Sequence, residues 1–195
     1  RTGAAIAEAL REKGYNAVEV ELVPEKLVEQ LKEIDAKVVF NAVHGMYGED
    51  GRLQSMLEAI KMPYTGSGVL ASAVAMDKIA TKRFLISANI STPKYLMYNK
   101  RFDKDAELIE KEIIATFVVP VVIKAADQGS SIGVEIVKSE ADVKTALENV
   151  FKYSDLVLVE ECINGKELTC GVMEVDGELK ALPIVMIVPH SGSYD

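Results

Sequence analysis

The first half of the chain alternates between helical and extended patterns of apolar residues. Residues 3–13 repeat apolar positions at helical spacing, and Gly14 follows where such a helix would end. Residues 17–23 have the β-branched character of a strand, and residues 24–33 begin with a proline suited to a first helical turn. Residues 36–43 are almost continuously apolar, which is typical of a parallel strand buried on both faces. This order predicts a doubly wound α/β domain whose first strand would precede Arg1.

The pattern changes in the second half, where short strands dominate. Asp176-Gly177 between two apolar runs predicts a hairpin, and Ser139 with Asp142 three residues later predicts a capped helix. This half therefore has the organisation of an α+β domain. The helices expected after residue 50 cover about 53–61, 69–75, 77–89 and part of 99–116. A short strand and turn is expected at 63–68, and further strands near 93–97, 121–125, 133–138 and 155–160.

Composition narrows the class of protein. The 195 residues carry a net charge of −8, which argues against a general nucleic-acid binder. Two cysteines in apolar surroundings indicate a reduced, cytoplasmic chain, and no apolar run is long enough for a membrane span or resembles a signal peptide. We expect small-molecule partners, with neither nucleic acid nor membrane among them. Because the chain opens directly on a helix and stops after a strand, we also expect further residues at both ends.

The loop from His44 to Gly51 gathers chemically versatile residues just after a predicted buried strand. It holds three glycines, a histidine and two carboxylates within eight residues. Open α/β sheets bind ligands at such strand ends, and a histidine with a glutamate can hold an amino acid or move a proton. A plain Gly-rich turn leading into a helix is the alternative.

A second loop suggests a phosphate site. The apolar run 121–123 delivers Lys124, and Ser130 and Ser131 then lie between Gly129 and Gly133. Glycines let backbone N–H groups approach an anion, while lysine and serine add a charge and hydroxyl donors. A Walker loop is excluded because the lysine precedes the glycines. A tight hairpin with a surface lysine at a strand end is the alternative.

Three charged positions have ordinary explanations when they are considered alone. Lys78, with Lys82 and Arg83 nearby, is typical of a solvated helix face. Glu160 ends an apolar strand, where a carboxylate commonly faces solvent, and Glu161 beside it is expected to be solvated.

Taken together, these segments resemble the D-alanine–D-alanine ligase family of the ATP-grasp superfamily. The resemblance is carried by His44 to Gln54 (HGxxGEDGxLQ), Tyr64 to Gly68, Ala75 to Lys78, Lys124 with Gly129 to Gly133, Val157 to Glu161, and Gly165 to Glu167. It implies a Rossmann-like domain at 1–77, a central ATP-grasp subdomain at 78–159 and the start of a C-terminal subdomain at 160–195. One departure is Ala125, where relatives commonly have proline.

The resemblance also implies a role for individual residues. Lys78 and Lys124 are expected on the phosphates of ATP, with Ser130 and Ser131 in the loop above them. His44 and Ser130 are the expected catalytic residues, and His44 with Glu49 is expected on the amino-acid side. The expected contacts to adenine and ribose are Glu160, Cys162, Ile163 and Glu167.

The implied activity is ATP-dependent synthesis of D-alanyl-D-alanine through a D-alanyl phosphate, for peptidoglycan precursors. Magnesium or manganese is expected, with ligands beyond Asp195 and none assigned here; a homodimer is also expected. Two alternatives stay open. One is a ligase that uses D-lactate or D-serine as second substrate, and the other is an ATP-binding module without catalysis.

Overall fold

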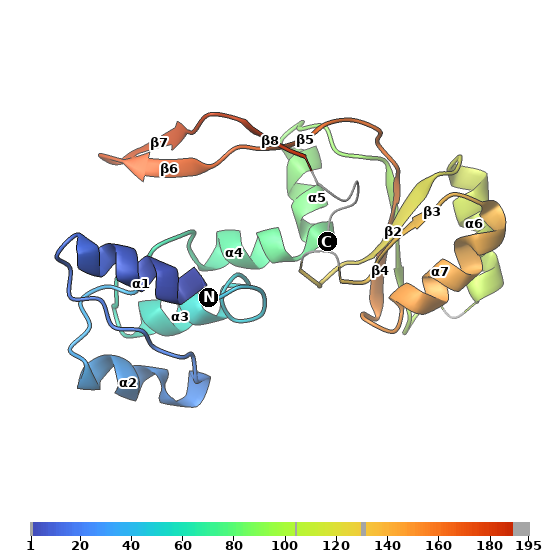
Figure 1. Cartoon of the computed structure of the whole chain (residues 1–195). Helices are drawn as coiled ribbons and strands as arrows, with labels where there is room; N and C mark the ends of the chain where they lie inside the picture. Colours follow the sequence, from blue (N-terminus) through green and yellow to red (C-terminus); the bar gives the residue numbers. More distant parts are fainter. Residues whose placement is uncertain (1, 104, 130–131, 189–195) are drawn as a thin grey trace. The chain divides into compact units, whose positions relative to one another are not determined.

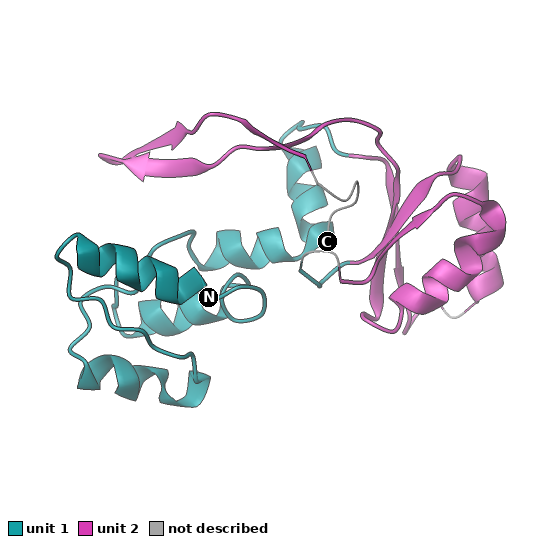
Figure 2. Cartoon of the chain, in the orientation of Figure 1, with its two compact units in different colours: residues 1–92, 126–129 teal, residues 93–125, 130–195 magenta. Residues whose placement is uncertain are grey.

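The computed structural model describes residues 2–103, 105–129 and 132–188. Contacts divide the chain into two compact units, one formed by residues 1–92 with 126–129 and the other by 93–125 with 130–195 (Figure 2). Each unit contains a hydrophobic cluster of its own.

The helices predicted for the first unit are confirmed. They are α1 (Thr2–Glu12), the short η1 (Pro24–Lys26) that leads into α2 (Leu27–Glu33), α3 (Arg52–Ala59), α4 (Val69–Met76) and α5 (Lys78–Ser87). Gly14 follows α1 with a φ of 86°, a left-handed conformation that glycine adopts without steric cost.

The predicted strands of this unit are not formed as expected. Residues 17–23 contribute no strand to the described part of the chain, and residues 36–43 make a single parallel bridge between Val39 and Tyr64. Val38 and Phe40 are 61% and 51% exposed, so the prediction of burial on both faces is wrong. A run of apolar residues is buried only where neighbouring strands and helices cover it, and the sequence pattern does not report whether they do.

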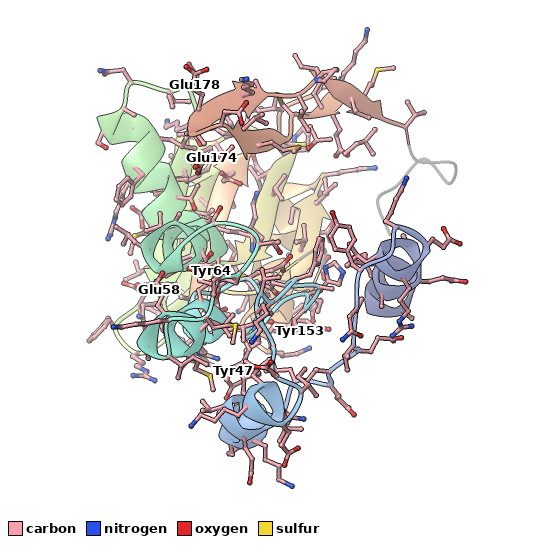
Figure 3. The ribbon with its side chains drawn as sticks, turned by 90° about the vertical axis from the view of Figure 1, so that its left-hand side faces the viewer. Tyr47, Glu58, Tyr64, Tyr153, Glu174 and Glu178 are labelled. Atoms are coloured by element: carbon pink, nitrogen blue, oxygen red, sulfur yellow. The ribbon has the colours of Figure 1, made fainter. Side chains whose placement is uncertain are left out.

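The core of the first unit lies between α2 and α3. Leu27 and Leu31 pack with Leu53 and Leu57, and Leu57 is completely buried. The end of α3 is joined to the bridged segment because the Tyr64 hydroxyl donates to Glu58 Oε1 at 2.7 Å (Figure 3). Desolvation, followed by the nearby Glu58 carboxylate, raises the pKa of the Tyr64 phenol.

The second unit is built on a four-stranded antiparallel sheet in the order β1-β4-β2-β3. Its strands are β1 (Tyr95–Asn99), β2 (Val121–Ala125), β3 (Val134–Val137) and β4 (Leu156–Glu161). Helices α6 (Ala106–Thr116) and α7 (Val143–Val150) cover one face of the sheet (Figure 1). The four strands lie where the sequence predicted them.

The chain continues beyond β4 in two small antiparallel pairs. β5 (Glu167–Thr169) pairs with β8 (Val185–Ile187), and β6 (Val172–Val175) pairs with β7 (Glu178–Ala181). The predicted turn joins β6 to β7, with positive φ at both Asp176 and Gly177. The predicted cap on the helix after β3 is wrong, because Ser139 makes no side-chain cap hydrogen bond before η2 (Glu140–Asp142).

Strand alternation separates the two faces of the sheet. On β2, Val121, Ile123 and Ala125 are at most 1% exposed and belong to the core beneath the helices, where Val157 and Val159 of β4 join them. The residues between them point to the opposite face, because successive side chains of a strand alternate. This second face carries Val122, Lys124, Leu158 and Glu160.

We predict that Ile123→Ala lowers the free energy of unfolding by about 2–5 kcal/mol, because it opens a cavity in a fully buried position. Ile136→Ala is the matched control, since Ile136 on the neighbouring β3 is 59% exposed. Its effect should stay below about 1 kcal/mol. Urea unfolding of both variants measures the difference, and equal losses would contradict the assigned core.

A second prediction concerns Tyr98, whose buried hydroxyl donates to Glu112 Oε2 at 3.1 Å. Burial, and then the Glu112 carboxylate, raise the pKa of the phenol. The folded chain therefore holds the phenolic proton more tightly than the unfolded chain. The resulting stability is complete below about pH 10, the ordinary phenol pKa, and is lost as the pH rises above it.

Tyr98→Phe tests this, because phenylalanine has no proton to lose. The free energy of unfolding should fall more steeply between about pH 10 and pH 12 in the unmodified chain than in the variant. Parallel pH profiles would show that Tyr98 contributes nothing to the alkaline loss.

Candidate functional site

The loop between residues 44 and 51 is held by its own polar groups. The N–H of Gly45 donates to Glu49 Oε2 at 2.6 Å, and the N–H of Glu49 donates back to the Gly45 carbonyl at 2.9 Å. His44 Nδ1 lies 3.8 Å from Glu49 Oε1, with the two side chains 74% and 52% exposed. The structure thus brings His44 and Glu49 together on an accessible loop, where they can act on a ligand.

The same loop is locked into the start of α3. Asp50 accepts hydrogen bonds from the N–H groups of Tyr47 and Arg52, at 2.9 and 3.1 Å. The Arg52 guanidinium lies 3.4 Å from Asp50 Oδ2 and stacks over the Tyr47 ring, which is labelled in Figure 3. A side chain at Gly51 would meet the Val69 carbonyl at 2.7 Å, so the loop enters the helix along a path that only glycine permits.

Lys78 is the first residue of α5, and the structure does not place it on a solvated face. Asp77 caps the helix by accepting from the N–H groups of Ile79 and Ala80. The Lys78 N–H donates to the Ala126 carbonyl at 3.0 Å, and its ammonium donates to the Gln128 carbonyl. Lys78 therefore contacts the segment that begins the loop of Gly129.

Lys82, one turn further along α5, is also not solvated. It is 4% exposed, and its ammonium donates to the Thr92 hydroxyl at 2.7 Å. Helical spacing alone could not show this, because burial depends on the segment that returns after the helix.

Lys124 and Glu160 form an ion pair on the face of the sheet opposite α6 and α7. Lys124 pairs with Leu158 across the two strands, so Glu160 lies diagonally, within reach of the lysine. Their side chains are 24% and 7% exposed, respectively, so the ordinary alternative of a solvent-facing Glu160 does not hold. A cation and an anion thus lie side by side on this face of the sheet, opposite the apolar side chains of Leu158 and Val122 across the two strands.

Glu161 has a structural task. Its Oε1 accepts from the Lys94 N–H at 2.7 Å and its own N–H donates to the Lys94 carbonyl at 3.1 Å, so this partly exposed side chain also joins β4 to the segment before β1. The next residue, Cys162, donates its N–H to the Pro120 carbonyl at 3.3 Å. Ile163 is 65% exposed, and Glu167 begins β5 as an exposed residue.

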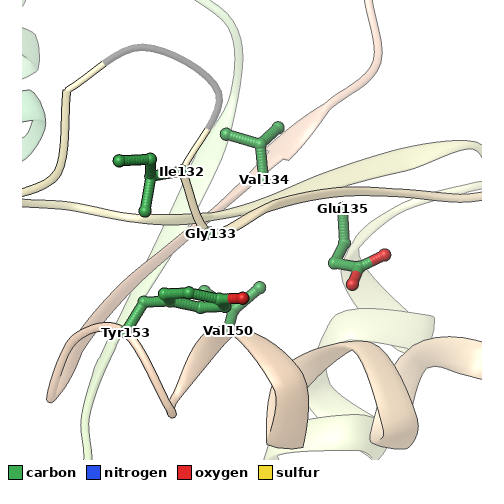
Figure 4. Close-up of a pocket in the computed structure, with 6 residues that line it drawn as sticks. All are labelled: Ile132, Gly133, Val134, Glu135, Val150 and Tyr153. Carbon is green, nitrogen blue, oxygen red and sulfur yellow. The ribbon is translucent and has the colours of Figure 1, made fainter. Parts of the chain in front are cut away.

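The far end of the Gly129–Gly133 loop is defined by a close contact. Gly133 has a φ of 65°, and a Cβ there would lie 3.0 Å from Ala125 Cβ and 3.1 Å from Tyr153 Cβ. Tyr153 lies below Gly133 beside Val150 and helps to line a hollow of about 300 Å³ (Figure 4). Ser130 and Ser131 lie outside the described residues, so the predictions for them remain predictions.

Within the described ranges, no three His, Cys, Asp or Glu side chains gather in a way that could hold a metal ion. The divalent metal expected from the resemblance therefore has no fitting set of ligands among these residues. No helix in the same ranges combines the length and apolar character needed to cross a membrane.

Two further polar residues hold the loop of residues 44–51, and the sequence pattern assigned no role to either of them. Asn41 and Gln54 both donate to the Gly48 carbonyl, at 2.7 and 2.8 Å. Gln54 closes the HGxxGEDGxLQ pattern, so the signal was present in the sequence. The sequence did not reveal the role of Gln54, because an amide on a helix gives no sign of the carbonyl that it will meet.

Comparison with known proteins identifies the family. The model described as D-ala D-ala ligase N-terminus matches residues 4–67, and that described as D-ala D-ala ligase C-terminus matches residues 84–195. A D-alanine–D-alanine ligase of Carboxydothermus hydrogenoformans is 42% identical over 195 residues, which is 100% of this chain and 62% of the relative.

Solved structures agree. The D-alanine–D-alanine ligase of Bacillus anthracis matches with a TM-score of 0.80 at 34% identity, over 100% of this chain and 62% of that one. The VanG D-Ala:D-Ser ligase of Enterococcus faecalis matches with a TM-score of 0.72 at 37% identity, over 82% of this chain and 46% of that one.

These matches confirm the predicted fold class, a Rossmann-like domain followed by ATP-grasp subdomains. The chain spans about three fifths of the length of the curated relatives that it matches. Both family models, the curated relatives and the solved structures agree, and the chain belongs to the D-alanine–D-alanine ligase family.

Proposed function

We propose that the protein containing this chain joins two D-alanine molecules at the expense of ATP, as a step in making peptidoglycan precursors. The observation that carries the proposal is the placement of Lys124 and Glu160 together on the sheet face that α6 and α7 leave uncovered. Relatives that match the chain over all of its residues are named D-alanine–D-alanine ligase, which supports this choice of substrate.

The sheet face of the second unit suits a nucleotide. Val122, which is partly exposed, can contact an adenine ring, Glu160 can accept from its amino group, and Lys124 can meet the phosphates. Cys162 would contribute its carbonyl, because its N–H already donates to Pro120. Ile163 beside it and Glu167, on the ribose hydroxyls, complete the proposed nucleotide contacts.

The first unit supplies the proposed amino-acid contacts and one more phosphate contact. Lys78 would meet the phosphates, with Ser130 and Ser131 in the loop that follows Gln128. His44 and Glu49 would hold the first D-alanine, because a histidine and a carboxylate can bind its charged groups.

The chemistry runs in two balanced steps. The carboxylate oxygen of the first D-alanine attacks the γ-phosphorus of ATP, and the bond to the bridging oxygen breaks, which gives D-alanyl phosphate and ADP. The neutral amine of the second D-alanine then attacks the carbonyl carbon. Phosphate leaves from the tetrahedral intermediate and the amine loses a proton. The lysines favour the first step by offsetting negative charge on the transferring group.

Ligases of this kind generally need a divalent metal, which would supply further positive charge at the phosphates. Magnesium or manganese is our proposal for that ion. The described residues gather no ligand set for it.

Three further expectations remain part of the proposal. We propose functional subdomain boundaries at residues 77/78 and 159/160. The compact units of the structure are divided differently, chiefly at 92/93. A cytoplasmic location fits a reaction that consumes ATP. A homodimer is the assembly that we expect.

We predict that the full-length natural protein, supplied with ATP and magnesium, releases phosphate when D-alanine is added. L-alanine should not replace D-alanine. The reason is that the proposed contacts at His44 and Glu49 would hold the first substrate in one chiral arrangement, which the hydrogen bonds within the loop support. A coupled phosphate-release assay with product analysis measures this. Equal turnover with L-alanine, or none with D-alanine, would overturn the proposal.

The same assay decides the second substrate. Because one structural relative is a D-Ala:D-Ser ligase, D-serine and D-lactate are added in turn beside D-alanine. We expect D-alanyl-D-alanine as the main product. A preference for either competitor would assign the chain to the corresponding ligase instead.

We further predict that Lys124→Ala weakens ATP binding by about tenfold or more, the effect of losing a charge-assisted hydrogen bond. Lys138→Ala is the control, since Lys138 is an exposed lysine just after β3. Isothermal titration measures both affinities. Because Lys124→Ala leaves the buried Glu160 without its ion pair, the double variant Lys124→Met/Glu160→Gln is measured beside it. Unchanged affinity in a folded variant would remove Lys124 from the phosphate site.

A further inference from the structure

The carbonyl of Gly48 is the fixed point of the loop that carries His44 and Glu49. It accepts one hydrogen bond from Asn41 Nδ2 at 2.7 Å and a second from Gln54 Nε2 at 2.8 Å, which uses both of its lone pairs. Asn41 lies in the segment before the loop, and Gln54 lies on α3 after it. The two amides therefore grip the loop from both of its ends.

The backbone at Gly48 leaves no room for another arrangement. A Cβ at this position would lie 2.1 Å from the Val43 carbonyl oxygen, so the loop folds directly back onto the segment from which it came. The Asn41 amide cannot turn around without loss, because its Oδ1 accepts from the Val43 N–H at 3.1 Å. Gly48 is buried, whereas His44 and Glu49 beside it are exposed. Their positions thus depend on the backbone that carries them.

Stability alone does not explain an amide at position 54. Gln54 is 3% exposed, and its Oε1 has no hydrogen-bond partner in the described part of the chain. A buried amide oxygen without a partner destabilises a fold, and methionine would fill similar space without that penalty. What glutamine supplies, and methionine lacks, is the donor to Gly48.

We propose that Asn41 and Gln54 are positioning residues for the first substrate: through the Gly48 carbonyl they hold His44 and Glu49 in the geometry that binds the amino acid. This inference rests on the proposed function, which places the first D-alanine at His44 and Glu49. Neither amide touches the substrate. Each acts through the backbone one residue before Glu49.

The chain offers a matched control in Gln30. Its Nε2 donates to the Glu21 carbonyl at 3.3 Å, and its Oε1 is likewise buried with no partner among the described residues. Gln30 lies on α2 of the same unit, and its amide donor meets Glu21 and not the loop of residues 44–51. Gln54→Met and Gln30→Met therefore each remove one side-chain amide donor. The donor of Gln54 meets the loop at Gly48, whereas the donor of Gln30 meets Glu21.

The test measures steady-state kinetics and thermal unfolding of both variants in the full-length natural protein. Gln54→Met should raise the KM for the first D-alanine about tenfold, leave the KM for ATP within about twofold, and keep or raise the unfolding temperature. Gln30→Met should leave both KM values unchanged. Asn41→Ala, which removes the other donor, should shift the KM for D-alanine in the same direction.

The outcomes separate this inference from the proposed function. If the unmodified protein is active with D-alanine but Gln54→Met keeps its KM, the positioning role is overturned and the function stands. If the unmodified protein is inactive, the proposed function fails. Hydrogen exchange of the backbone amides then tests whether Gln54 holds the loop. The Gly45 and Glu49 amides should exchange faster in Gln54→Met than in Gln30→Met, and equal rates would overturn it.

Discussion

The alternation of side chains along β2 and β4 is the constraint on which the second unit depends. One set of positions packs beneath α6 and α7, and the intervening set, which includes Lys124 and Glu160, is directed to the other face. A shift of either strand by one residue would bury the charges in the core and expose the core residues. The register of these two strands therefore determines both the hydrophobic packing and the placement of the candidate site.

In the first unit, the loop of residues 44–51 is held in place through its backbone groups. Gly48 and Gly51 lie where a side chain would strike the carbonyls of Val43 and Val69, so the loop of residues 44–51 follows a path that larger residues cannot take. Polar side chains then tie its N–H and C=O groups, with Asn41 and Gln54 on Gly48 and Glu49 on Gly45. An exposed histidine and glutamate can be held in place in this way without being buried.

The two units differ in how well the sequence predicted them. The helices, the four strands of the main sheet and the turn at Asp176-Gly177 follow from local periodicity and turn chemistry, which act within a few residues. The predicted burial of residues 36–43 failed, because it required neighbours that the described chain does not place there. Lys82 and Glu160 are not solvated as their sequence neighbours alone would suggest, and Glu161 makes an added contact, since each meets a group distant in sequence or on another strand.

The sequence by itself determined the order of elements and the identity of the chemical groups, because helical spacing, strand alternation and ordered motifs are written in consecutive residues. It also contained the family signature from His44 to Gln54. Only the tertiary structure decided which groups meet. The pairing of Lys124 with Glu160 depends on strand register, and the two amides on Gly48 depend on a loop that returns to its own beginning. Contacts of this kind join positions whose separation in the chain carries no record of their proximity in space.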